Sequence, residues 1–436
     1  MEKHLIKKGL VFAVILLFIC MSITQSTAFD NVKKSSMPIS SGNILYVGGN
    51  GTGNYSNIQS AIDDASPGDT VFVFNDSSPY YECLFLNKTV SLVGEDRYST
   101  VVDSEHEGSP VEVYANSCLV SGFTLKNCSD SIYGHNFDVV KIFDSDYVTV
   151  SDNILSIGEL EYNDFISVVE LYDSCYCNIS GNIIFEIDKV SRSAGVSFYT
   201  RSCYNTISGN VISNYVWGIV FEWDSGCDGN IISGNHISNS FFGIDLHGCN
   251  DNKILNNTIE YNDKGINIYD AQNTMISGNV IQFNGEGYEF DCGISLTSLS
   301  KDCRYNTISG NIISKNNPSG ILVIYAFGNV IKENNFIDNY GPTGKSPKKW
   351  WGNAYFCLPF RLRSLIRANS WNNNYWSDYK GSGVKIILGD IEILGALLGF
   401  GWFQFDLHPA QESYFIKIFR TPLAYLYKIK ILCQFK

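Results

Sequence analysis

One short phrase recurs through the middle of this chain. Ile-Ser-Gly-Asn, followed by one further residue (apolar in all copies but one) and isoleucine, occurs at residues 179–184, 207–212, 232–237, 276–281 and 308–313. With looser copies it places asparagines 22 to 32 residues apart, at Asn153, Asn182, Asn210, Asn235, Asn257, Asn279, Asn311 and Asn335. Self-similarity at this spacing is typical of a solenoid, in which each repeat buries its apolar face only against its neighbours.

A second phrase follows each asparagine and begins with glycine, as in Gly218-Ile-Val-Phe and Gly243-Ile-Asp-Leu. Both phrases alternate apolar and polar residues, which is the periodicity of a strand. The glycines and asparagines between them allow the chain to turn. The pattern therefore predicts an all-β fold, a single-stranded parallel β-helix of about nine to eleven coils. In such a solenoid the asparagine column can form hydrogen bonds along the axis.

Composition divides the chain into five expected parts. Residues 1–28 have the basic start and short apolar run of a signal peptide, with an uncleaved anchor as the alternative, and 29–43 are a linker. Residues 44–340 form the β-helix, with an N-terminal cap at 44–70 that includes a short helix opened by a capping box at Ser56. Residues 341–412 are the last coils and an aromatic-rich C-terminal cap. The basic apolar tail, 413–436, either packs on the acidic body or contacts an anionic membrane surface.

Charge and cysteine content restrict the partners and the compartment. The net charge is −13, although both the signal and the tail are basic, so the body is more acidic than the whole chain. Such a body repels nucleic acid, which we exclude as a partner. The sequence predicts nearly one column at a coil corner for six of the cysteines, either as stacked thiols or as disulfides: Cys175, Cys177, Cys203, Cys227, Cys249 and Cys303.

Several segments resemble a known group of proteins. Residues 53–70, 80–82 and 91–95 resemble the N-terminal cap of secreted right-handed parallel β-helix proteins, while the repeats and residues 373–379 resemble the NosD-like group. The resemblance covers most of residues 44–380 and lies within the broader class of carbohydrate-binding and sugar-hydrolase β-helices. It implies a right-handed coil. It also implies extracellular glycan or cell-surface polysaccharide as the partner.

The NosD namesake is an exported accessory protein for the copper sites of nitrous-oxide reductase. Few histidines and methionines are present here, which disfavours that role. The catalytic phrases of pectin methylesterases and polygalacturonases are also absent from the sequence.

Aligning the coils on the glycine phrase predicts a site on one outer face. Tyr199, Glu222, His247 and Tyr269 fall in one outward column, Asp245 and Asn267 fall two residues earlier, and Trp223 lies beside them. We expect these seven residues to bind ligand, because aromatic rings stack on pyranose faces. Glu222, Asp245 and His247 are the candidates for catalysis, since paired carboxylates cleave glycosidic bonds. The alternative is a solvated sheet face with no function.

No cofactor or metal is predicted. Asp144, Asp173 and Asp270 at strand ends either hold Ca²⁺ or form turns. The sequence thus predicts a secreted or cell-surface repeat protein, which is a non-catalytic module for binding glycan or for structure. A polysaccharide hydrolase or lyase acting in a groove along the β-helix is the alternative, and a copper-maturation accessory is the disfavoured one.

Overall fold

The computed structural model describes residues 42–128, 138–158, 165–186, 192–223, 225–285, 291–339, 353–359, 368–393 and 398–414. The expected signal, nearly all of the linker and most of the basic tail lie outside these residues. Within them, no helix has the length and apolar character needed to cross a bilayer.

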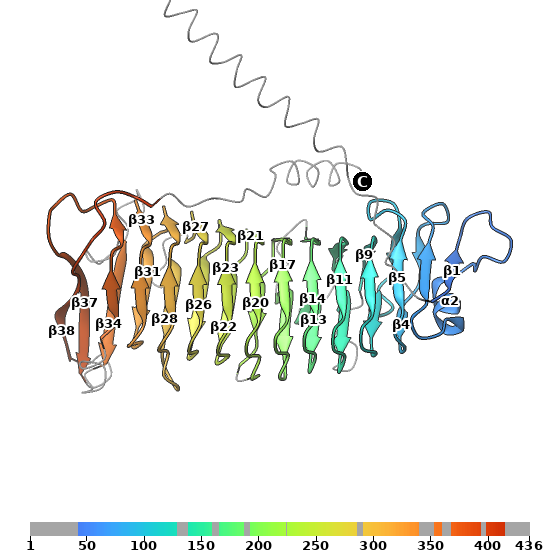
Figure 1. Ribbon diagram of the computed structural model, residues 1–436, viewed down its shortest axis with the longest axis horizontal. Helices are drawn as coiled ribbons and strands as arrows, with labels where there is room; N and C mark the ends of the chain where they lie inside the picture. The colour runs from blue at the N-terminus through green and yellow to red at the C-terminus, as the bar shows by residue number, and fades with distance from the viewer. Residues whose placement is uncertain are drawn as a thin grey trace, which may run out of the picture. The chain divides into compact units, whose positions relative to one another are not determined.

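The described chain winds into a parallel β-helix whose coils follow one another along a single axis (Figure 1). Each full coil contributes one strand to each of three faces, and every pairing within a face is parallel. The third face holds twelve strands, so the described coils outnumber the nine to eleven that were expected. The all-β prediction is confirmed.

The first face consists of β1 (Ile44–Val47), β2 (Thr70–Val73), β5 (Ser91–Gly94), β8 (Leu119–Ser121), β11 (Thr149–Ser151), β14 (Asn178–Ser180), β17 (Thr206–Ser208), β20 (Ile231–Ser233), β23 (Lys253–Leu255), β26 (Met275–Ser277), β29 (Thr307–Ser309), β32 (Val330–Lys332), β35 (Ser370–Asn372) and β38 (Leu398–Asp406). The third face consists of β3 (Tyr80–Tyr81), β6 (Val101–Asp103), β9 (Thr124–Lys126), β12 (Ile154–Ser156), β15 (Ile183–Phe185), β18 (Val211–Ser213), β21 (His236–Ser238), β24 (Thr258–Glu260), β27 (Val280–Gln282), β30 (Ile312–Ser314), β33 (Asn335–Ile337) and β36 (Tyr375–Trp376).

The second face has the longest strands of the central coils. It consists of β4 (Leu84–Leu86), β7 (Val111–Val113), β10 (Val140–Phe143), β13 (Ile166–Tyr172), β16 (Ser193–Tyr199), β19 (Trp217–Phe221), β22 (Phe242–His247), β25 (Lys264–Tyr269), β28 (Cys292–Thr297), β31 (Ser319–Ile324), β34 (Ala354–Pro359) and β37 (Lys385–Ile393). The antiparallel hairpin of β37 and β38 joins the second face to the first at the C-terminal end.

The core is a set of stacked apolar columns inside the coil. Ile207, Ile232, Ile254 and Ile276 pair in succession on the first face, and all of them are fully buried. The alternation of the strand phrases explains this, because every second side chain points inward. Each coil therefore covers the apolar surface of the next, and one elongated core serves the whole β-helix.

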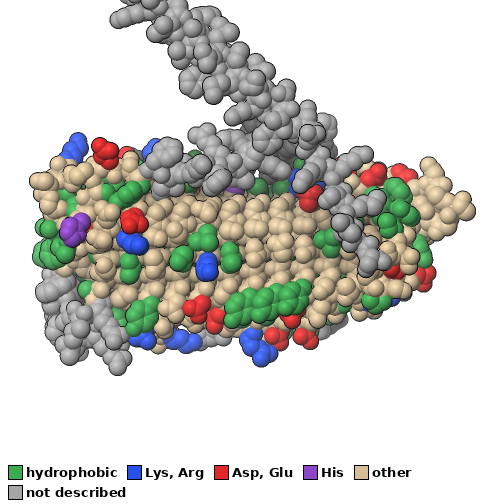
Figure 2. All heavy atoms as spheres, in the orientation of Figure 1, with side chains coloured by type: hydrophobic (Ala, Val, Ile, Leu, Met, Phe, Trp, Pro, Cys, Tyr) green, Lys and Arg blue, Asp and Glu red, His purple; other side chains and the backbone are tan. Residues whose placement is uncertain are grey.

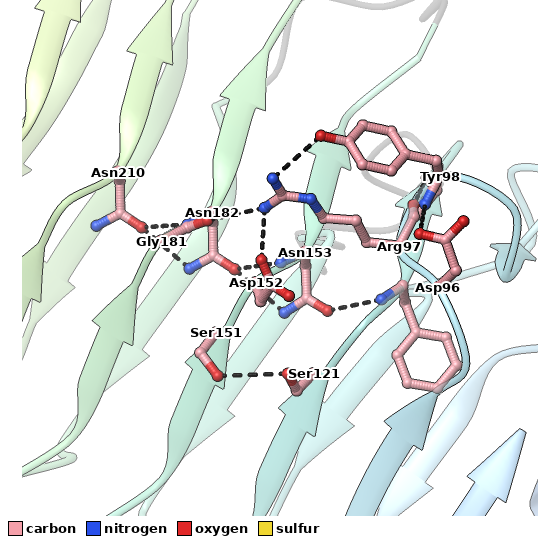
Figure 3. Close-up of polar contacts among 12 residues, drawn as sticks. Asp96, Arg97, Tyr98, Ser121, Ser151, Asp152, Asn153, Gly181, Asn182 and Asn210 are labelled. Carbon is pink, nitrogen blue, oxygen red and sulfur yellow. Dashed lines mark hydrogen bonds and ion pairs between the residues drawn. The ribbon is translucent and has the colours of Figure 1, made fainter. Parts of the chain in front are cut away.

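The repeated asparagine forms a buried hydrogen-bonded ladder between the first and third faces (Figure 3). In each step the backbone N–H and the side-chain Nδ2 of one asparagine donate to Oδ1 of the next, as from Asn210 to Asn235 at 2.9 and 3.0 Å. The Nδ2 of Asn235 also donates to the carbonyl of Ile207 at 2.8 Å. The ladder runs from Asn153 through Asn374 to Asp406.

One expected member of this ladder is wrong. After Asn311 the partner is Asn334, not Asn335. Asn335 instead begins β33, where its side chain pairs with the backbone of Tyr414. Two adjacent asparagines in the sequence made the register ambiguous by one residue.

The other two corners carry ladders of their own, which the sequence analysis did not find. Between the second and first faces one links Cys177, Asn205, Asn230 and Asn252. Between the third and second faces one links Ser240, Asn262, Asn284, Asn316, Asn339 and Asn353. Buried corners thus satisfy the hydrogen-bonding groups of their backbone through side chains.

The outer surface in view is mostly uncharged polar groups and backbone (Figure 2).

Glycines are needed at two different kinds of position. The residue before each ladder asparagine turns the corner in the left-handed region, and in five coils it is a glycine, for example Gly209 at φ +64°. The glycine of the second phrase has no such φ but lies against the next coil. A Cβ on Gly243 would be 2.5 Å from the carbonyl oxygen of Gly265 and 2.8 Å from Cγ2 of Ile259.

The N-terminal cap contains the short helix α2 (Ile58–Asp64), whose Ile58, Ala61 and Ile62 are buried. Its N-cap is Asn57, which accepts from Ser60 N at 2.8 Å, so the expected capping box at Ser56 is wrong.

Further along, Arg97 contacts the first ladder from outside. Its Nη1 is 2.7 Å from Asp152 Oδ1 and 3.2 Å from the Gly181 carbonyl (Figure 3).

No disulfide joins the described cysteines, and the six cysteines expected at a corner do not share one column. Cys203 N donates to Cys175 Sγ at 3.3 Å in one column, whereas the N–H of Cys177 donates to Asn205 in the ladder two residues further on. The expectation of nearly one column is therefore wrong. It rested on the number of residues between each cysteine and the next repeat asparagine, and that number varies enough to place the cysteines at different positions of the corner.

Glu186 makes the stability of the fold depend on pH. Its carboxylate, after β15, accepts from Ile157 N and from Ser156 Oγ, and it is almost fully buried. Burial raises its pKa to about 7. A carboxyl whose pKa is raised on folding stabilises the protein fully below its unfolded pKa, and this contribution disappears as pH rises toward 7.

We therefore expect the urea midpoint of unfolding to fall as pH rises from about 4.5 to about 7, by a contribution of roughly 3 kcal/mol from this group. Glu186→Gln should show a smaller fall than the parent protein over the same range. An unchanged pH dependence in that variant would contradict the assignment.

Candidate functional site

Two outward rows of side chains run along the second face. We call them the polar row, Glu112, Lys141, Glu170, Ser197, Val220, Asp245, Asn267 and Ser295, and the aromatic row, Tyr114, Phe143, Tyr172, Tyr199, Glu222, His247, Tyr269 and Thr297. Strand register sets the polar row, with Val220 paired to Asp245 and Asp245 to Asn267. The aromatic row lies two residues further along each strand, with Tyr172 paired to Tyr199 and His247 to Tyr269.

Asp245 is the most densely bonded side chain in these rows. Its Oδ2 accepts from the indole nitrogen of Trp217 at 3.1 Å, and its Oδ1 accepts from Asn267 Nδ2 at 2.7 Å. His247 Nε2 is also 2.9 Å from Oδ1. Only 3 % of Asp245 is exposed. Three donors from three coils thus fix this carboxylate rigidly.

His247 is held between Asp245 and two aromatic rings. Its ring centroid is 4.6 Å from that of Trp223 and 5.1 Å from that of Tyr269, and Trp223 is 4.9 Å from Tyr269. Since Nε2 donates to Asp245, Nδ1 is an acceptor, and no donor among the described residues reaches it. Trp223 itself is 60 % exposed. The cluster therefore combines a rigid polar base with an accessible aromatic surface.

Tyr199 and Glu222 lie next in the aromatic row. Phe198 pairs with Phe221 and Phe221 with Leu246, so Tyr199, Glu222 and His247 occupy the following position on successive coils. Burial raises the pKa of the Tyr199 hydroxyl, and the adjacent Glu222 carboxylate raises it further. Tyr199 is therefore a neutral hydroxyl group at physiological pH.

Towards the N-terminus the aromatic row becomes a stack of rings. Phe143 and Tyr172 are 4.9 Å apart and nearly parallel, and Tyr114 lies 5.9 Å from Phe143. The Tyr114 hydroxyl donates to Glu112 in the polar row. This hydrogen bond links the aromatic row to the polar row.

All seven residues expected at the site lie on neighbouring coils of this face. Three others were missed: Trp217, Asp138 and Glu170. Trp217 precedes Gly218 and could have been found by extending the glycine alignment backwards. Glu170 could not, because its coil has Val168 in place of the phrase glycine and so gave no point of alignment.

The three aspartates that were expected either to hold Ca²⁺ or to form turns lie in turns. Asp144, Asp173 and Asp270 all occupy left-handed turns after their strands. The Asp270 carboxylate accepts from Leu299 N at 2.7 Å and from Ser300 N at 2.9 Å. Nowhere in the described part of the chain do three His, Cys, Asp or Glu side chains gather as metal ligands.

Comparison with known proteins supports the fold. The right handed beta helix region family matches residues 156–298 and 218–346 of this chain. The predicted right-handed parallel β-helix is therefore confirmed. No curated protein sequence matches the chain.

Solved structures with similar coils include three of known class. The Dettilon tailspike protein is 17 % identical, with a TM-score of 0.48 over 72 % of this chain and 68 % of that one. The A-module of the Azotobacter vinelandii mannuronan C-5 epimerase AlgE6 is 16 % identical, with a TM-score of 0.43 over 72 % and 94 %. PfbA, a surface adhesin of Streptococcus pneumoniae, is 12 % identical, with a TM-score of 0.42 over 80 % and 89 %. At this level of similarity we transfer no activity.

Proposed function

We propose that the polar and aromatic rows of the second face bind an extended glycan. The observation that carries this proposal is the cluster at Trp223. An exposed indole ring lies against His247 and Tyr269, directly beside the fully bonded Asp245. An accessible aromatic ring next to rigid polar groups is the arrangement that stacks on a sugar and orients its hydroxyls. Coils about 4.8 Å apart repeat such groups along the axis at steps that a glycan chain can follow.

The bonding of Asp245 favours binding over cleavage. Asp245 is only 3 % exposed and its Oδ1 already accepts from Asn267 and lies 2.9 Å from His247 Nε2, so a glycosidic oxygen has little access to this carboxylate. The accessible part of the cluster is instead Trp223, which is 60 % exposed and offers a ring face on which a sugar can stack. We therefore expect no new reducing or unsaturated ends when a glycan is incubated with the protein.

We also infer that this binding takes place outside the cell, either in solution or at the cell surface. The support is the signal-like composition of residues 1–28. A purely structural role for the repeats is the alternative, and it predicts no glycan binding at all.

Trp223→Ala should weaken glycan binding at least roughly tenfold, because it removes the largest accessible ring of the site. Binding can be measured on a glycan array and then by titration calorimetry. Thermal unfolding should change little, since this ring is mostly exposed.

Phe405→Ala is the matched control. Phe405 is also an exposed aromatic residue, at 48 %, but it lies on β38 at the C-terminal end of the β-helix, far from the site (Figure 1). Equal loss in both variants, or no loss in either, would contradict the placement of the site.

A further inference from the structure

Two cysteines lie next to one another on successive coils, at the corner between the second and first faces. Cys175 precedes β14 and Cys203 precedes β17, two strands that pair directly with each other. The backbone N–H of Cys203 donates to the sulfur of Cys175 at 3.3 Å. Both side chains are partly exposed, so a reagent in solution can reach them.

The two thiols occupy consecutive steps of a fourth hydrogen-bonded ladder, which we call the outer ladder. In each step a side chain accepts from the backbone N–H of the corresponding residue on the next coil, as Asp146 Oδ1 accepts from Cys175 N at 2.8 Å. Its members in order are Asn116, Asp146, Cys175, Cys203, Asp228, Asn250 and Gln272. A thiol sulfur is a weaker acceptor than the oxygen of aspartate or asparagine. Two consecutive thiols therefore weaken the hydrogen bonds of this ladder, but they can form a covalent bond, which oxygens in their place could not.

The backbone around both cysteines is held at the spacing of the coils. The carbonyl of Cys175 accepts from Tyr147 N at 3.0 Å, and that of Cys203 accepts from Tyr176 N at 3.1 Å. The rings of Tyr176 and Tyr204, which directly follow the two cysteines, are stacked with their centroids 5.3 Å apart. Neighbouring backbones in a sheet lie about 4.8 Å apart, which is within the range of Cα separations that a disulfide spans. At this distance a bond between the two sulfurs requires no movement of the coils.

One of the two side chains already has the direction that such a bond needs. The Cys175 sulfur points to the coil of Cys203, since it also donates to the carbonyl of Arg201 at 3.2 Å. The Cys203 sulfur is turned to the following coil, where it donates to the carbonyl of Gly226 at 3.1 Å and accepts from Asp228 N at 3.3 Å. Rotation about the Cα–Cβ bond of Cys203 to another staggered position would turn this sulfur back toward Cys175, at the loss of these two hydrogen bonds.

We propose that Cys175 and Cys203 form a reversible disulfide when the protein meets a small disulfide oxidant such as oxidised glutathione. The thiolate of one cysteine attacks a sulfur of the oxidant and releases one glutathione; the second thiolate then displaces the other. The S–S bond of the oxidant breaks as that of the protein forms, so two electrons pass to glutathione. The two thiol protons end on the two glutathione molecules that leave. This pairing does not depend on glycan binding by the second face.

Thiol mapping by mass spectrometry tests the pairing. The full chain, purified under reducing conditions, is equilibrated at a series of ratios of reduced to oxidised glutathione, quenched with acid, unfolded, alkylated and digested. We expect Cys175 and Cys203 to lose their thiols together and to appear in one pair of linked peptides at the glutathione ratio of an oxidising compartment. Cys227 and Cys249 are the comparison, because they also lie on successive coils but are fully buried, and they should remain alkylated thiols.

The bond should also stabilise the fold, because it joins residues that are 28 apart in the sequence and so restricts the unfolded chain. Under oxidising conditions the thermal midpoint of the parent protein should exceed that of Cys203→Ser by several degrees, and reduction should remove this difference. Cys83→Ser is the matched control. Cys83 is also partly exposed, but strand register places Pro110 opposite it on the next coil, so this variant should behave like the parent under both conditions.

Three results would overturn the proposal. The two thiols could remain free at every glutathione ratio, either of them could pair with a different cysteine, or Cys227 and Cys249 could become oxidised while Cys175 and Cys203 stay reduced. All three are read from the parent protein, so the test stands even if Cys203→Ser fails to fold.

Discussion

Asn235→Ala is expected to lower the free energy of unfolding by roughly 3–6 kcal/mol. The side chain accepts from both nitrogens of Asn210 and donates to Ile207 O and to Asn257 Oδ1, all in the buried corner. Alanine would leave several of these groups without partners, at about 1–3 kcal/mol each. Urea denaturation followed by circular dichroism measures the loss.

Asn178→Ala provides the control for this ladder residue. Asn178 lies two coils earlier, in β14, is partly exposed, and its side chain donates to Ser180 Oγ at 3.1 Å. Its replacement should change the free energy of unfolding by less than about 0.5 kcal/mol. If the two alanine variants were equally stable, the ladder would not be what holds the corner together.

Gly243→Ala is expected to destabilise the β-helix by about 3 kcal/mol or more. The new methyl group would collide with the backbone carbonyl of Gly265, which cannot move without separating the coils, and with Ile259 in the core. The thermal midpoint of the variant should therefore fall sharply.

Gly209→Ala tests the other kind of glycine. A Cβ there has no heavy atom nearer than 4.0 Å, but the residue has a φ of +64°. Alanine in that conformation costs about 1–2 kcal/mol, so this variant should be the milder of the two. The explanation fails if Gly209→Ala proves more damaging than Gly243→Ala.

Much of the fold was predictable because each repeat contains the same two short sequence phrases. The phrases around Asn210 and Gly218 specify a corner, an inward column and a close approach between coils within a dozen residues. Asparagine also recurs at the other two corners, and an alignment on those asparagines could have found their ladders. Only the first members, Cys177 and Ser240, break the pattern, and they donate through their backbone N–H groups.

The site was predictable only where the glycine phrase supplied a register. That alignment placed Asp245 beside Asn267 and His247 beside Tyr269. It could not show that the indole of Trp217 donates to Asp245, since the two residues lie at different positions of their strands on successive coils. The coils of Asp138 and Glu170 have Val139 and Val168 in place of that glycine, so these two buried carboxyl groups had no sequence signal.

The first ladder keeps the same geometry while the chain between its members changes in length. Successive asparagines are separated by 22 to 40 residues, yet the Nδ2 to Oδ1 distance stays between 2.9 and 3.1 Å in every step. Extra segments can therefore be inserted between rungs without shifting the rungs themselves. Evolution, or a protein engineer, can therefore change the segments of one coil at a time and leave the asparagine ladder unchanged.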